Sequence, residues 1–151
     1  MKSTLSFKHY DVIETVYRFN PGSELEEEDV TPDLNLKINY LEENRKKAAL
    51  IFSVELGDPE LGDNSFYIKA TIVGIFYLSS DEDEEIPDEF IDHMYKKNAL
   101  AILYPYMRSL ISDLTSKGSE NPIILPPINI GAIVEEQDLI IEEYSAEDTI
   151  I

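Results

Sequence analysis

The N-terminal half of the chain contains four apolar segments whose residue pattern predicts β-strands. They span residues 12–19, 34–40, 48–56 and 66–78. The first three alternate inward- and outward-facing side chains, as half-buried strands do, whereas 66–78 is apolar on both faces and needs cover on both sides. Most connections between them are too short for helices, which predicts an antiparallel meander. The acidic run 24–29 is interpreted as an exposed crossover loop.

The pattern changes after a second acidic run at residues 81–85. Pro87 suits the first turn of a helix, and Asp88 and Glu89 would lie beside the positive end of its dipole. From Asn98 onward, apolar residues recur every three or four positions, which predicts a long amphipathic helix that ends at Gly118. The apolar positions are Leu100, Leu103, Met107, Leu110, Ile111 and Leu114, and Pro105 inside this segment predicts a kink.

Beyond Gly118 the chain is irregular. The apolar segment 123–128 contains two prolines and is interpreted as an extended loop. Asn129 can cap a short helix through about Val134. From about residue 136 the tail is acidic and expected to be mobile, and its apolar cluster 139–141 has no assigned place.

These elements predict one α+β domain over residues 1–151: a four-stranded antiparallel sheet, a meander with a crossover loop, packed with one long kinked helix and one short C-terminal helix. A domain of about 150 residues buries roughly 70% of its unfolded surface, so it can form a core without disulfides or metals.

The charge limits the partners. The chain carries 31 acidic and 12 basic residues, a formal net charge of −19. Nucleic acids and anionic membranes would be repelled, whereas a basic partner would be attracted. No segment has the form of a signal peptide or reaches the ~20 apolar residues of a membrane span, so we expect a cytoplasmic protein.

Residues for covalent chemistry are sparse. There is no cysteine, which excludes disulfides and thiolate metal sites. His9 and His93 lie in unrelated segments, and the acidic runs lack the spacing of a calcium-binding loop. No phosphate-binding glycine loop or nucleophile motif occurs. We therefore predict no catalytic residue, no metal and no cofactor.

Four segments together resemble the SecB family of protein-export chaperones. Residues 98–115 (NALAILYPYMRSLISDLT) are similar to the family's central helix, with its aromatic-Pro-Tyr-x-Arg element at 104–108. The loop 125–129 (LPPIN) follows at the expected distance. Upstream, 74–76 (GIF) and 32–38 (PDLNLKI) are similar to parts of the family's fourth and second strands. The resemblance covers roughly residues 32–134.

The resemblance implies a surface that binds non-native polypeptide, and an assembly of four chains as a dimer of dimers. Carried over by position, the polypeptide-binding groove would be lined by Leu34, Leu36, Ile38, Ile124, Leu125, Ile130, Ile133 and Val134. The oligomer interface would include Ile68, Ala70 and Ile72. Lys69 stands where the family often carries a glutamate that docks the translocase motor SecA, which puts that interaction in doubt.

Three functions therefore stay open. The first is a holdase that binds many unfolded preproteins for export. The second is a SecB-like chaperone with one dedicated client, such as an antitoxin. The third is an acidic regulator that mimics a charged ligand of a basic protein, and its binding would weaken as salt screens exposed charges.

Overall fold

The computed structural model describes residues 3–20, 32–57, 59–60, 66–80, 86–118, 123–125, 129, 132–133 and 139–145. In chain order these form β1 (Ser3–Phe19), β2 (Asp33–Tyr40), β3 (Lys47–Gly57), β4 (Phe66–Ser80), α1 (Asp88–His93), the π-helical segment η1 (Met94–Ala99), α2 (Leu100–Gly118) and β5 (Leu139–Tyr144). The predicted α+β class, single sheet and long helix are confirmed.

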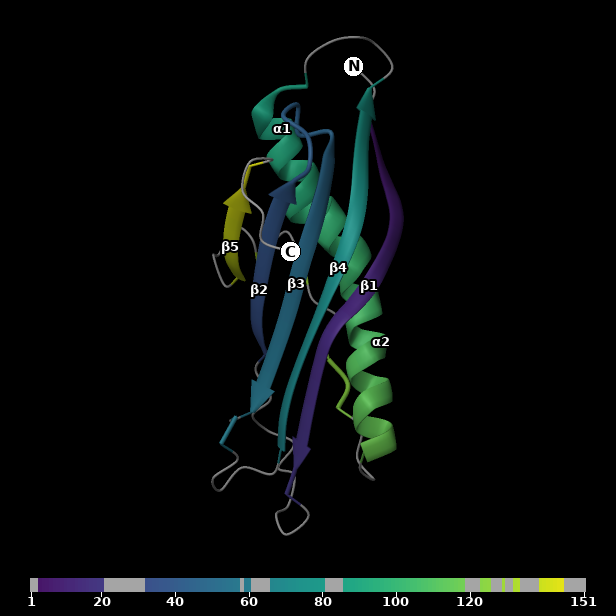
Figure 1. Cartoon of the computed structure of the whole chain (residues 1–151), viewed down its shortest axis with the longest axis vertical. Coiled ribbons are helices and arrows are strands. Elements are labelled where there is room, and N and C mark those ends of the chain that lie inside the picture. The colour runs from purple at the N-terminus through teal and green to yellow at the C-terminus, as the bar shows by residue number, and fades with distance from the viewer. Residues whose placement is uncertain are drawn as a thin grey trace.

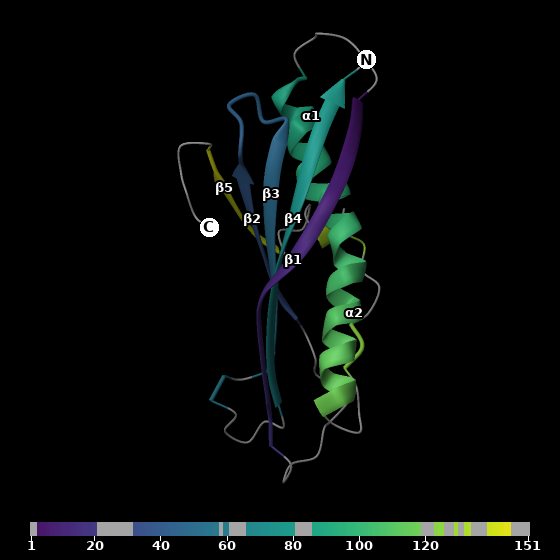
Figure 2. The same ribbon diagram turned by 45° about the vertical axis from the view of Figure 1, so that its right-hand side comes forward.

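The sheet has the order β1-β4-β3-β2-β5 (Figure 1). Strands β2, β3 and β4 form the predicted meander, and β1 crosses over to pair with β4; all these pairs are antiparallel. The predicted strand number was wrong, because β5 adds a fifth strand, parallel to β2. Figures 1 and 2 show the continuous helical segment α1-η1-α2 along one face of the sheet.

Alternation along the strands determines which side chains the helix covers. In β2, β3 and β4 the even-numbered apolar residues are buried, and Leu36, Phe52 and Ile72 among them are 0% exposed. They pack against Leu100, Leu103 and other apolar residues of the helix. Strand β4 is apolar on both faces as predicted, and Val73 on its other face is also buried, at 8% exposure.

The helical segment starts at the expected place. Pro87 is its N-cap residue, and Asp88 and Glu89 lie in the first turn, where carboxylates interact favourably with the helix dipole. Six residues of η1 then adopt π-helical geometry, which the sequence did not indicate. Pro105 lies inside α2, and the kink predicted there stays a prediction.

The predicted C-terminal helix is not established. Ala132 and Ile133 are helical, and the Ala132 N–H donates to Asn129 Oδ1 at 3.1 Å, as the expected cap would. The rest of the predicted helix lies outside the described residues.

Candidate functional site

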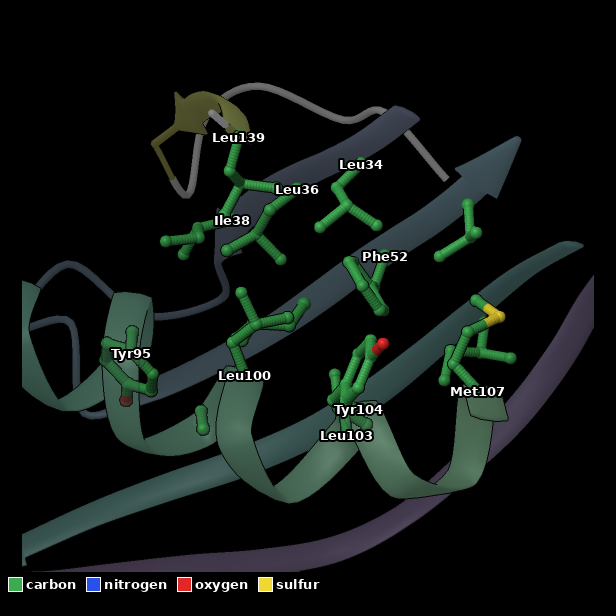
Figure 3. Packing of buried hydrophobic residues seen from close by; sticks show 14 of the residues in the cluster. Leu34, Leu36, Ile38, Phe52, Tyr95, Leu100, Leu103, Tyr104, Met107 and Leu139 are labelled. Carbon is green, nitrogen blue, oxygen red and sulfur yellow. The ribbon is translucent and has the colours of Figure 1, made fainter. Parts of the chain in front are cut away.

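The predicted groove residues of β2 lie in the layer between the sheet and the helix. Leu34, Leu36 and Ile38 are 7%, 0% and 0% exposed. In Figure 3 they point, with Phe52 of β3, toward Leu100 and the rest of the helix. They therefore form one continuous apolar row, but in this conformation the row is covered. Their role in binding a polypeptide stays a prediction, and it requires the cover to move.

Strand β5 covers the outer edge of this row. The parallel register places Leu139 opposite Leu34 and Ile141 opposite Leu36. Leu139 is 4% exposed, and Ile141 is partly buried against the same cluster. The apolar cluster at 139–141, unassigned from sequence, thus belongs to the sheet.

A polar cluster holds the far end of β5. The Tyr40 hydroxyl donates to Glu143 Oε1 at 3.4 Å, and Lys96 Nζ lies 3.3 Å from the same oxygen. Lys96 also lies 3.7 Å from Asp92 one helical turn earlier. Burial, and next the negative charge of Glu143, raise the pKa of Tyr40 well above its usual value. Tyr40 is therefore a neutral hydrogen-bond donor at physiological pH.

The loop 123–125 is held against α2 by two side chains. Arg108 donates from Nε to the Leu125 carbonyl oxygen at 2.9 Å. Thr115 is buried, and its Oγ1 accepts the Ile123 N–H at 2.7 Å. These contacts give the conspicuous Arg108 of the sequence motif a structural role.

The predicted groove residues of this C-terminal region have different environments. Ile124 is 69% exposed, whereas its neighbour Leu125 is 1% exposed in the core. Ile133 is partly buried against the core. Ile130 and Val134 lie outside the described residues. Ile124 is thus the predicted groove residue that is freely accessible to a client among those described.

The predicted interface residues of β4 face inward. Ile68, Ala70 and Ile72 are all 0% exposed within the single chain. Because α2 and the rest of the core already cover them, an interface role for them stays a prediction that would require the helix to move away. Lys69 between them lies on the opposite face, with its Nζ 3.9 Å from Glu14 of β1.

Sequence reasoning missed an exposed apolar surface on β1. Tyr10, Val12 and Ile13 are 37%, 47% and 50% exposed. The ring centroids of Tyr10 and Tyr106 lie 4.6 Å apart. Tyr106 belongs to α2 and is 40% exposed. We call these four residues the β1 patch. The alternation of the sequence was the available signal, but only the sheet order shows that β1 is an edge strand.

Within the described ranges, no three His, Cys, Asp or Glu residues are placed to share a metal ion. None of the helices described is both long and apolar enough to cross a membrane. What the site offers is apolar side-chain surface and a strand edge, which suit the binding of extended polypeptide.

The sequence matches the SecB family, described as preprotein translocase subunit SecB, over residues 17–139. The chain therefore belongs to the SecB family, whose members are chaperones and not enzymes, and the resemblance seen in the sequence is confirmed.

Two sequence relatives and one solved structure are similar to this chain. The protein-export protein SecB of Actinobacillus succinogenes is 29% identical over 114 residues, 76% of this chain and 66% of that protein. An uncharacterized protein of Methanocaldococcus jannaschii is 28% identical over 98% of this chain and 91% of its own length. The fold is similar to that of a SecB-like chaperone of Mycobacterium tuberculosis, solved in complex with an antitoxin peptide; its TM-score is 0.64 at 13% identity, over 82% of this chain and 87% of that chain.

Proposed function

We propose that this protein is a holdase, which binds extended segments of non-native polypeptide and catalyses no reaction. The observation that carries the proposal is the match to the SecB family over residues 17–139, combined with a continuous apolar row on β2. Burial of apolar side chains contributes about 25 cal/mol per Å² whatever their order, so such a row can bind many sequences. Export of preproteins from the cytoplasm is the role that the family's name supports.

A dedicated client is the second candidate. The M. tuberculosis chaperone with this fold was solved with a peptide from an antitoxin, so the fold can serve one partner. In this chain Lys69 is paired with Glu14, and no acidic residue stands at that position to dock a translocase motor. Interaction with SecA is therefore not part of the proposal, and a dedicated client would need none.

Self-association is the third part of the proposal, and the β1 patch supports it. β1 is a 17-residue edge strand that carries three exposed apolar residues. A long apolar edge strand is a template for pairing with another chain unless it is covered. We propose that two copies meet at β1, and that tetramers form from such dimers.

The test is binding of several unrelated, chemically unfolded polypeptides at moderate and at high salt. We expect binding of many clients that persists at high salt and shows a negative heat-capacity change, because apolar burial drives it. Binding of a single client would favour the dedicated role. Binding that collapses with salt would favour the charge mimic, and no binding would contradict the holdase.

A matched pair of variants locates the contact surface. Ile124→Asp adds a charge at an apolar position that is 69% exposed, so it can weaken client binding without unfolding the protein. Ser109→Asp adds the same charge at an exposed position on α2. We expect only the first variant to lose affinity. Equal affinities would remove Ile124 from the proposed surface.

A further inference from the structure

Strand β5 has an unusual place in the sheet. All other strand pairs are antiparallel, whereas β5 runs parallel to β2, at the edge opposite β1. It comes from the end of the chain, well after α2, and joins the sheet beside the predicted groove row (Figure 1). β5 follows all the other described elements in the chain and pairs only at an edge of the sheet. Its pairing resembles that of an extended peptide that augments an exposed sheet edge.

The side chains of β5 are less buried than those of β3, the other strand that pairs with β2. Of the core-facing side chains of β5, Leu139 is buried, Ile141 is partly buried, and Glu143 is more exposed. Ile140, on the other face, is 63% exposed. The Glu143 contact with Lys96 joins partly exposed side chains at 3.3 Å, and such ion pairs add little stability. Parallel pairing is also slightly weaker per residue than antiparallel pairing.

The apolar row of β2 that β5 covers is more apolar than β5 itself. Without it, the outer backbone N–H and C=O groups of β2 would lose their partners, and the flank of Leu34 and Leu36 would open. An open strand edge beside an apolar row offers an extended polypeptide both backbone hydrogen bonds and pockets for alternate side chains.

We propose that the β2 edge is a binding site for an extended segment of the client, and that β5 occupies this site in the absence of a client. A client segment with apolar residues at two alternate positions, in place of Leu139 and Ile141, displaces β5 and pairs with β2. This inference rests on the proposed chaperone function and adds where a client binds and what competes with it.

The arrangement has two consequences. With β5 in place, the β2 edge is blocked against pairing with other copies of the chain. Because β5 competes for the edge, a client can bind only those molecules in which the edge is open. The apparent affinity for the client is lower than the intrinsic affinity by that fraction. Short apolar segments then bind poorly, and long unfolded chains, which offer many segments, bind well.

A disulfide between β2 and β5 tests the proposal in the full chain. Asn35 lies opposite Ile140 in the parallel register, and both side chains are on the face away from the helix. The chain has no cysteine, so Asn35→Cys with Ile140→Cys can form only this pair within one chain. Opposed residues of neighbouring strands lie within the Cα–Cα range of a disulfide. Oxidised and reduced samples of the same double variant then differ only in whether β5 can leave.

The probe is a chemically unfolded polypeptide that the wild-type protein binds. We expect the oxidised variant to bind it at least about tenfold more weakly than the reduced one, because the open fraction is removed. Equal affinities of the two forms would overturn the inference while leaving the chaperone function intact. No binding by the wild type would instead contradict the proposed function. A disulfide that forms only between two chains would also overturn the inference, because β5 would then not pair within its own chain.

A second pair of variants acts in the opposite direction. Leu139→Asp places a charge at a 4% exposed position and should release β5, whereas Ile140→Asp changes a 63% exposed neighbour. We expect Leu139→Asp to bind the same polypeptide at least about threefold more tightly and Ile140→Asp to match the wild type. Weaker binding by Leu139→Asp would show that β5 is part of the client site and not its competitor.

Discussion

Gly74 of β4 lies directly beneath Leu103 of α2, and a Cβ atom at position 74 would lie 2.6 Å from Leu103 Cδ2. The same atom would lie 3.0 Å from Phe76 Cε2. Leu103 and Phe76 are both 0% exposed, so neither side chain can swing into solvent. The absence of a side chain at Gly74 therefore sets how closely the helix approaches the sheet.

Gly74→Ala should destabilise the protein by overpacking, by about 1–3 kcal/mol in the free energy of unfolding. Urea unfolding measures the change. The double variant Gly74→Ala/Leu103→Ala is the control, because it removes the methyl groups that the new Cβ would meet. Its cost should be smaller than the sum of the two single costs, and strict additivity would contradict the contact.

Thr115 provides a second test, in the contact between α2 and the following loop. Its Oγ1 donates to the Ile111 carbonyl oxygen at 2.8 Å and accepts the buried Ile123 N–H at 2.7 Å. Thr115→Val keeps the shape but leaves this N–H without a partner, which should cost about 1–3 kcal/mol in unfolding free energy. Thr115→Ser keeps the hydroxyl and should cost less. Amide exchange of Ile123 should accelerate in the valine variant alone; unchanged exchange would contradict the hydrogen bond.

Local patterns were sufficient to predict much of this fold. The three meander strands lie within one or two residues of their predicted bounds, because each carries a period of two or a continuous apolar run. The helix periodicity from Leu100 to Leu114 and the stop at Gly118 are likewise present in α2. Strand β1 starts earlier than predicted, at Ser3, and its register shifts near His9 and Ile13 interrupt the alternation that would have revealed it.

Non-local features could not be predicted in the same way. The segment of β5 is short, with two acidic residues out of six, and its strand structure depends on an edge of β2 that is about 100 residues earlier. The sequence also could not predict what buries these side chains. The alternation of Leu34, Leu36 and Ile38 shows that one face of the strand is apolar, but not whether a helix, a client or β5 covers that face. The exposed β1 patch depends on the strand order, which the alternation alone does not determine.

The buried tyrosines predict a loss of stability at alkaline pH. Tyr95 is 0% exposed, its hydroxyl donates to the Arg45 carbonyl oxygen at 2.9 Å, and burial, with the negative charge of Glu42, raises its pKa well above the usual value. In the unfolded chain the phenol loses its proton near pH 10, whereas in the folded protein it keeps it. The unfolded state then binds fewer protons, so stability falls as the pH rises above about 10, by about 1.4 kcal/mol per pH unit for this group.

The Tyr95→Phe variant isolates the contribution of the Tyr95 phenol to this alkaline loss of stability. The variant loses one hydrogen bond, which should cost about 1 kcal/mol at neutral pH. Above pH 10 its unfolding free energy should fall less steeply than that of the wild type, because one titrating group is gone. Urea unfolding between pH 8 and about pH 11 gives both slopes. Parallel profiles would show that the Tyr95 phenol is not protected in the folded state.

The β1 patch predicts where copies of the chain associate. Ile13 is 50% exposed at a register shift of the edge strand β1, so a charge there meets solvent in the monomer but would lie inside an interface between two β1 strands. Ile13→Lys should therefore leave the unfolding free energy within about 0.5 kcal/mol of wild type and abolish self-association. Ile140→Lys, on the opposite edge strand at 63% exposure, carries the same change and should leave association intact. Sedimentation at micromolar concentration distinguishes the species: if Ile13→Lys sediments with the wild-type oligomer, or the wild type is itself a monomer, copies do not meet at β1.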